Sequence, residues 1–318
     1  MTRVRLATVV LVLAGAFAGH AQAATAPATK GVVLVTTDLA YENASAAGTG
    51  IVLTASGEVL TNNHVIRGAT TINIILPTTQ RQYSAQVIGY DIADDIALLQ
   101  VNGAPKLATA TRADSAKLKV GQATRAVGNA NGGGKLVITT GKVTALHQSI
   151  TVNDEQGGSS QLSGLIRTSA LLVPGDSGGP LIDATGRVIG VDAAGSSAPG
   201  DGYAIPINKA WTLAKQMAGG GASTIVHIGK TAFLGIQVSD ATGSIVVGAI
   251  IPGTAAETSG LQANDTITSL DGQAVSALPD IRRILFAHHP GDAITVGYLD
   301  PTGQPATASL TLGDGPPQ

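Results

Sequence analysis

Short segments rich in β-branched and aliphatic residues dominate the chain between residues 31 and 207, and they restrict its fold more than any other feature. Gly, Asn and Asp separate these segments, and no stretch with helical spacing lies between them. This pattern favours an all-β barrel or sandwich. The segments are residues 31–35, 50–53, 71–76, 85–89, 96–101, 135–143 and 188–192.

The composition agrees with a mainly β protein. Hydrophobic residues make up 44% of the 318 residues and aromatic residues only 3%, so the core must be built from Val, Ile, Leu and Ala. The 41 glycines indicate many tight turns. The chain contains no cysteine, which excludes a cysteine nucleophile and thiolate metal sites.

A second domain is predicted after a glycine-rich break. Residues 209–217 have helical spacing, with Trp211, Ala214 and Met217 on one face, and glycines 219–221 follow. The remaining segment is long enough to fold alone as a small α+β module. Its expected elements are strands 233–238, 245–250, 293–298 and 306–312, helices 255–260 and 278–288, and a two-residue hairpin turn at 271–272.

The N-terminus is typical of an export signal. Arg3 and Arg5 precede the uncharged apolar residues 6–19, and Ala21-Gln22-Ala23 has the small-x-small pattern of a signal peptidase site. We therefore predict a signal peptide over residues 1–23 and a secreted or cell-envelope location. The alternative is a retained anchor, although the apolar stretch is shorter than the roughly 20 residues of a membrane span.

The predicted mature chain is mildly acidic. Cleavage after Ala23 removes two of the 19 basic residues and no acidic one, which leaves 17 basic against 21 acidic residues and a net charge of −4. This balance argues against a nucleic-acid partner. No further apolar run approaches the length of a membrane span.

Ser177 lies in a glycine-rich turn, Gly-Asp-Ser-Gly-Gly-Pro, at 175–180. A serine hydroxyl becomes a good nucleophile when an imidazole takes its proton and a carboxylate orients that imidazole. Flanking glycines let the backbone aim N–H groups at an oxyanion, and the natural donors are those of Gly175 and Ser177. The alternative is an ordinary turn, since each of these residue types favours turns.

His64 is the candidate base by elimination. Of the six histidines, His20 belongs to the predicted signal peptide, and three lie in the predicted second domain. His147 has no comparable setting, whereas His64 follows a strand-like segment in Thr-Asn-Asn-His-Val-Ile. The structural alternative is that His64 is only a hydrogen-bonding residue at a strand end.

Three carboxylates compete to orient that base. Asp95 directly precedes an apolar strand, where its side chain can be buried and held in place, so we favour it. Asp91 and Asp94 are interpreted as solvated turn residues. The order His64, Asp95, Ser177 is the chymotrypsin order of this triad.

With these residues identified, the chain resembles the HtrA/DegP family of exported trypsin-like proteases with a C-terminal PDZ domain. It looks most similar to the secreted actinobacterial PepA-type members. The motifs that carry the resemblance are GTGIV at 48–52, TNNHVI at 61–66, DIALL at 95–99, GDSGGP at 175–180, GYAIP at 202–206, VHIG at 226–229, FLGI at 233–236 and HHPGD at 288–292.

The resemblance implies a mainly β chymotrypsin-like fold. Two perpendicular six-stranded barrels would form a protease domain at 24–218 with the triad between them, and Asp95 would be the triad acid. A linker at 219–223 and a PDZ domain with a C-terminal tail at 224–318 would follow. Phe233, Leu234, Gly235 and Ile236 would form the loop that binds the C-terminal carboxylate of a hydrophobic peptide. The alternative is a small β domain without a ligand.

Two departures from the family pattern limit the inference. HtrA members usually have Asn before the nucleophile, whereas Asp176 stands there as in digestive trypsins, whose acid pairs with a new N-terminal amine. No Ile-Val-Gly-Gly start exists, so Asp176 must have another partner or remain solvated. Residues 24–30 also lack the aromatic arm that trimerises many HtrA proteins, so the oligomeric state stays open.

The substrate pocket is predicted from the alignment to the family. Its walls would be Leu171, Leu172, Val173, Ala193, Ala194 and Gly195. No acid stands at the pocket floor, where Leu171 is expected, so cleavage after small or medium apolar residues such as Ala, Val or Leu is predicted rather than after Arg or Lys.

The favoured function is endoproteolysis of unfolded or exported polypeptides, with the PDZ domain binding peptides or regulating the site. A catalytically silent exported chaperone or peptide-binding protein is the alternative. An esterase lacks the strand-turn-helix context of its serine motif. No metal or cofactor is predicted, because adjacent His288 and His289 on a helix point in different directions.

Overall fold

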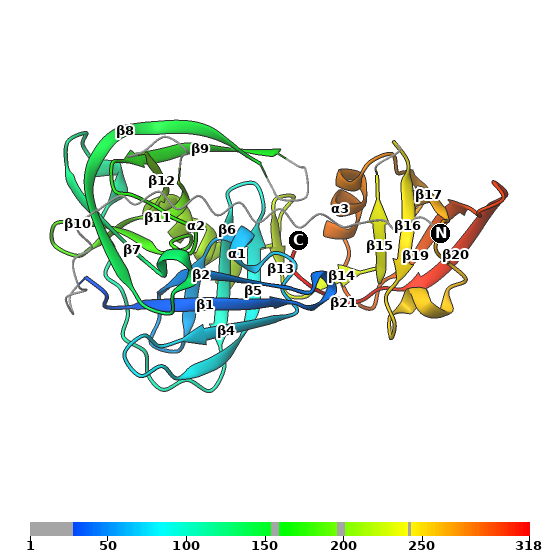
Figure 1. Cartoon of the computed structure of the whole chain (residues 1–318), viewed down its shortest axis with the longest axis horizontal. Coiled ribbons are helices and arrows are strands. Elements are labelled where there is room, and N and C mark those ends of the chain that lie inside the picture. Colours follow the sequence, from blue (N-terminus) through cyan, green and yellow to red (C-terminus); the bar gives the residue numbers. More distant parts are fainter. Residues whose placement is uncertain (1–27, 154–158, 196–200, 241–242) are drawn as a thin grey trace, which may run out of the picture.

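The computed structural model describes residues 28–153, 159–195, 201–240 and 243–318. Two β-barrels and a smaller unit of sheet and helix follow one another along the chain (Figure 1). The architecture is mainly β and agrees with the predicted fold class. Within the described residues, no helix is long and apolar enough to cross a membrane.

The first barrel consists of six antiparallel strands. They run in the order β5-β4-β1-β2-β3-β6, and β6 pairs again with β5 to close the ring. Its core is almost wholly aliphatic, as the low aromatic content predicts, with Tyr90 as the largest fully buried side chain. The elements are β1 Val32–Leu39, η1 Ala40–Glu42, β2 Ala44–Val52, β3 Glu58–Thr61, α1 Asn63–Ile66, β4 Thr71–Ile75, β5 Gln82–Asp91 and β6 Ile96–Val101.

The second barrel also has six antiparallel strands and closes in the order β10-β11-β12-β9-β8-β7. Long strands β8 and β9 curve over its upper side in Figure 1. The elements are η2 Ser115–Lys117, β7 Ala123–Gly128, η3 Ala130–Gly132, β8 Val137–Asn153, β9 Ser159–Thr168, β10 Pro180–Asp183, β11 Val188–Gly195 and β12 Gly202–Pro206.

Helix α2, Ile207–Ala218, joins the two barrels, because it contacts β11 and β12 of the second barrel and β5 and β6 of the first. It begins two positions before the predicted helix. Its buried face is Ile207, Ala210, Leu213, Ala214 and Met217. Trp211, predicted on that face, is instead partly exposed at its side, where the Arg112 guanidinium lies 4.8 Å from the ring centroid.

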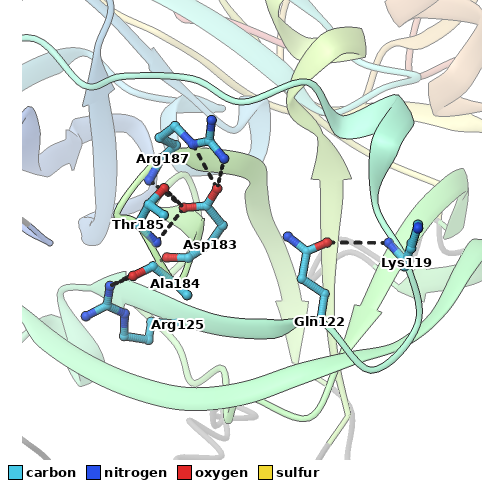
Figure 2. Close-up of polar contacts among 7 residues, drawn as sticks. All are labelled: Lys119, Gln122, Arg125, Asp183, Ala184, Thr185 and Arg187. Atoms are coloured by element: carbon cyan, nitrogen blue, oxygen red, sulfur yellow. Dashed lines mark hydrogen bonds and ion pairs between the residues drawn. The ribbon is translucent and has the colours of Figure 1, made fainter.

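A short hydrogen-bonded turn joins β10 to β11 (Figure 2). Asp183 Oδ1 accepts the N–H groups of Thr185 and Arg187 and the Thr185 hydroxyl, and Oδ2 accepts Arg187 Nε at 3.0 Å. Burial raises the pKa of Asp183, but these donors outweigh it and bring the pKa below its usual value. The turn fixes the register of the two strands that follow the Ser177 loop.

The third unit is a six-stranded sheet with one helix and a separate two-stranded sheet, β14-β21. The predicted hairpin turn at Asp271-Gly272 is present, and both residues have the positive φ of a type I′ turn. The elements are β14 Thr231–Phe233, β15 Ile236–Ser239, β16 Ile245–Ile250, η4 Ala255–Thr258, β17 Thr266–Leu270, β18 Gln273–Ala274, α3 Leu278–Phe286, β19 Ala293–Leu299, β20 Pro305–Thr311 and β21 Gly313–Gly315.

The single strand predicted at 233–238 is wrong. The chain forms β14 and β15 in two different sheets, with a break at Leu234 and Gly235. Gly235 has φ +84°, and a Cβ there would lie 2.0 Å from Thr254 Oγ1, so only glycine fits the bend. The helix expected at 255–260 is the shorter 3₁₀ turn η4.

Two segments attach the third unit to the first barrel. Strand β13, Val226–Ile228, pairs with β5, although the sequence pattern assigned these residues to the second domain. At the other end, Asn63 Nδ2 donates to the Gln318 carbonyl at 2.9 Å, and the Gly68 N–H donates to Pro317. The Tyr41 ring also stacks on Phe233 with 5.2 Å between centroids.

Candidate active site

The loop between β9 and β10 presents Ser177. Two glycines of this loop, Gly175 and Gly178, have φ +93° and +81°. A Cβ on either would lie 2.2 Å from a carbonyl oxygen, that of Asn129 or that of Thr49. Only glycine can occupy these positions without displacing the loop.

Thr49 of β2 holds the loop against the first barrel. Its hydroxyl donates to the Gly175 carbonyl at 2.7 Å and accepts the Asn129 N–H at 2.9 Å. Its N–H donates to the Ser177 carbonyl at 2.8 Å. The sequence pattern marked 48–52 as a motif but assigned Thr49 no role, since its partners are more than 75 positions away.

The N–H groups of Gly175 and Ser177 are available for an oxyanion. In the part of the chain that the structure describes, neither of them donates to a protein acceptor. Neighbouring N–H groups are satisfied: Asp176 donates to Val173 and Gly178 donates to Asp192. Two free donors flanking a serine side chain are what stabilisation of a tetrahedral oxyanion requires.

His64 is oriented by Asp95 through two hydrogen bonds. Its Nδ1 lies 2.8 Å from Asp95 Oδ2, and its own N–H donates to Oδ1 at 2.9 Å. Asn62 Nδ2 donates to the Asp95 carbonyl at 2.8 Å, which fixes the backbone of an acid held at φ +53°. Asp95 is 8% exposed, whereas the His64 side chain is 41% exposed and can reach a substrate.

The two neighbouring acids have other partners. Asp94 pairs with Lys209 of α2 at 2.5 Å, and its N–H donates to Asp91 Oδ1 at 2.9 Å. Asp91 is fully buried at the end of β5, so its interpretation as a solvated turn residue is wrong. The desolvation raises the pKa of Asp91, and the Asp94 N–H only partly offsets this.

The environment of His64 predicts the acid limb of the activity profile. Desolvation lowers the pKa of His64, but the charge of Asp95 and the hydrogen bond with it raise the pKa above its ordinary 6.5. A base acts as the neutral imidazole, so kcat/KM should rise with pH with a midpoint above 6.5. A pH profile of kcat/KM measures this directly, and a midpoint below 6.5 would contradict the arrangement.

A cavity of about 640 Å³ brings residues of both barrels together. His64 and Asp95 line it from the first barrel, and Gly175 and Ser177 line it from the second. Apolar residues complete the second-barrel side: Val152, Leu162, Pro174 and Ala193. The cleft between the barrels therefore contains Ser177, His64, Asp95 and Gly175, the residues for which the sequence predicts catalytic roles.

Of the predicted pocket residues, the structure places Ala193 in this cavity. Leu172 is instead buried in the core of the second barrel, and Leu171 is 47% exposed. Val173 and Gly195 do not contribute to the cavity lining, and the Ala194 side chain lies outside the described residues.

The loop predicted to bind carboxylates connects β14 to β15. Leu234 is buried, and the N–H groups of Leu234 and Gly235 donate to no acceptor among the described residues. Phe233 pairs with Gly313 of β21 and stacks on Tyr41. The loop thus has two free donors at the start of β15.

Comparison with known proteins follows the same division of the chain. Residues 48–191 match the family of trypsin-like peptidase domains, and residues 232–310 match the PDZ domain family. The serine protease Do-like HtrA of Lactococcus lactis subsp. cremoris is 32% identical over 297 residues, which cover 84% of this chain and 71% of that protein.

The chain belongs to the HtrA family.

Other members align similarly. The periplasmic pH-dependent serine endoprotease DegQ of Escherichia coli is 36% identical over 83% of this HtrA-family chain, which spans 59% of the DegQ length. The serine protease PepD of Mycobacterium tuberculosis is 29% identical over 93% of the chain and 66% of PepD. A solved structure of the HtrA-type protease AlgW with a tripeptide matches 92% of the chain and 96% of AlgW at 27% identity, with a TM-score of 0.53.

Proposed function

We propose that this HtrA-family chain is a serine endopeptidase in which Ser177 is the nucleophile, His64 the general base and Asp95 the acid that orients it. The observation that supports this most strongly is the double hydrogen bond between Asp95 and His64 in the cavity that Ser177 also lines. The N–H groups of Gly175 and Ser177 would stabilise the oxyanion. Polypeptides are the substrate class, as the names of the relatives suggest.

A fluorophosphonate probe tests this proposal against a catalytically silent binder. Such probes react with a serine only when its hydroxyl is activated. We expect stoichiometric labelling of the full chain at Ser177 and none in Ser177→Ala. Asp94→Asn serves as the control, because Asp94 pairs with Lys209 outside the triad. If no Ser177-dependent labelling occurs, either without or with added peptides, the protease proposal is contradicted.

We further propose that the PDZ domain binds the C-terminal carboxylate of hydrophobic peptides at Leu234 and Gly235. The two free N–H groups of this loop support the proposal, because a peptide carboxylate can accept both while the peptide adds as a strand beside β15. A peptide with a free carboxylate should bind at least 10-fold more tightly than its C-terminal amide. Equal affinity would contradict this mode of binding.

Two further proposals, on export and on substrate preference, rest on the sequence alone. We propose export with cleavage after Ala23, which sequencing of the N-terminus of the mature protein tests; an intact Met1 would contradict it. We also propose cleavage after small or medium apolar residues. A peptide panel in which Arg or Lys is best accepted before the scissile bond would overturn that preference.

A further inference from the structure

Asp176, the acid before the nucleophile, is buried without a cation. It is 4% exposed, so it is not solvated, and its Oδ2 accepts the Val173 N–H at 2.9 Å within the same loop. A Cβ on Gly128 would lie 2.4 Å from Asp176 Oδ1, so the carboxyl packs directly on the end of β7. Among the described residues, no basic side chain forms an ion pair with it.

A second acid lies behind the same loop. Asp192 of β11 is completely buried, and neither of its side-chain oxygens has a hydrogen-bond donor among the described residues. Its backbone is part of the nucleophile loop's support: its carbonyl accepts the Gly178 N–H and its N–H donates to the Gly179 carbonyl, both at 2.8 Å. A shift of Asp192 would therefore move the residues that follow Ser177.

Burial without hydrogen-bond donors favours the neutral, protonated form of the Asp192 side chain. A carboxylate that leaves water and gains no hydrogen bond is so unfavourable that the group binds a proton instead. Burial raises the pKa of Asp192 well above its usual value, and the charge of Asp176 raises it further. Burial also raises the pKa of Asp176, to about 6, although the Val173 N–H opposes this.

The different surroundings of Asp176 and Asp192 imply that the two acids lose their protons at different pH. Asp176 loses its proton first, because the Val173 N–H stabilises its carboxylate. We therefore expect Asp192 to keep its proton when Asp176 has lost its own, so that two buried acids carry one proton between them. Asp176 is the ionisable group whose charge acts on Asp192, whereas the charges that act on His64 are those of Asp95 and Arg67.

We propose that Asp176 as a carboxylate and Asp192 as a neutral carboxylic acid form a buried one-proton pair that positions the Ser177 loop for the reaction. In this arrangement the proton neutralises Asp192, so the loop buries the single negative charge of Asp176 without a basic side chain beside it. Both are positioning residues, since neither lines the cavity that holds His64 and Ser177. The effect on activity rests on the proposed function.

The first test is the alkaline limb of kcat/KM, normalised to sites titrated with the fluorophosphonate probe. Loss of the Asp192 proton places an unpaired carboxylate behind the loop, so the wild-type chain should lose activity at alkaline pH. Asp192→Asn, which is neutral at every pH and similar in shape, should keep activity within about 3-fold at neutral pH and lack this loss. Asp176→Asn should move the loss to lower pH, because it removes the charge that disfavours Asp192 ionisation.

A merely structural role of the pair predicts neither change. Asp183→Asn is the matched control, because Asp183 is a buried acid on the adjacent strand β10 whose charged form is stabilised by donors of Thr185 and Arg187. It should leave the alkaline limb unchanged. An alkaline limb in Asp192→Asn that coincides with the wild-type limb would overturn the proposal.

The second test does not depend on catalysis. The infrared difference spectrum of the full wild-type chain minus Asp192→Asn at neutral pH should contain the C=O stretch of a protonated carboxyl, whereas the contribution of another buried acid such as Asp91 cancels. Absence of this band from the difference spectrum would overturn the pair even if the enzyme is active. Presence of the band in a chain without protease activity would support the pair and reject the proposed function separately.

Discussion

Replacement of Asp95 by asparagine should lower kcat/KM by about 10⁴-fold. The Asp95 carboxylate accepts from both Nδ1 and the backbone N–H of His64, and an amide can offer only one oxygen to these two donors. The NH2 group of the new asparagine would donate to His64 Nδ1 and so place the imidazole proton on Nε2. In this tautomer Nε2 cannot take the Ser177 proton. Kinetics on a peptide substrate measure the loss, most of which should appear in kcat.

Asp94→Asn provides the matched control for this experiment. Asp94 is adjacent in sequence but pairs with Lys209 of α2, so its replacement should change kcat/KM by less than about 3-fold. Comparable losses in Asp94→Asn and Asp95→Asn would show that the segment acts through folding rather than through His64. A reduction of less than about 10-fold in Asp95→Asn would contradict the assignment of Asp95 as the orienting acid.

Replacement of Gly175 by alanine should lower kcat by about 10²- to 10³-fold. Gly175 has φ +93°, and a Cβ would lie 2.2 Å from the Asn129 carbonyl, so the backbone must rotate or move away. Either change turns the Gly175 N–H from the position where the oxyanion forms. KM should change little, because the lost interaction develops mainly in the transition state.

Gly134→Ala controls for the strain of a positive φ alone. Gly134 has φ +74°, but a Cβ there meets no atom within 4 Å. Its variant should fold and cleave substrate nearly as the wild-type chain does. If Gly175→Ala retained full kcat while remaining folded, its N–H could not be an essential oxyanion donor.

Local patterns allowed much of this site to be predicted from the sequence. The glycines around Ser177 report a backbone conformation that only glycine adopts, and the structure places them at positive φ with no room for a Cβ. His64 and Asp95 could be singled out because few histidines exist and because an acid precedes an apolar strand. The strands of the first barrel followed from their β-branched composition.

Features that depend on distant partners could not be predicted in the same way. Asp91 is a turn acid by composition, and its burial follows from the way β5, β6 and β13 meet around it. The break at Gly235 depends on Thr254, 19 positions later. Asp192 gave a signal that could have been used, because an acid between Val191 and Ala193 is unusual inside an apolar strand.

The attachment of the PDZ domain at both of its ends affects how it can move. Strand β13 belongs to the sheet of the first barrel, and β14 begins after only Gly229 and Lys230. A rotation of the domain relative to the barrel would therefore occur at residues 229–230 and not at the glycines 219–221, which precede β13. Gly229 has φ +79°, a Cβ there would meet no atom within 4 Å, and its N–H donates to the Ile88 carbonyl of β5 at 2.9 Å. The contacts of Pro317 and Gln318 with Gly68 and Asn63 hold the domain against the first barrel, as does the Tyr41 ring stacked on Phe233. Any rotation of the domain about residues 229–230 would therefore have to break several contacts, and one set of them involves Asn63, which directly precedes His64.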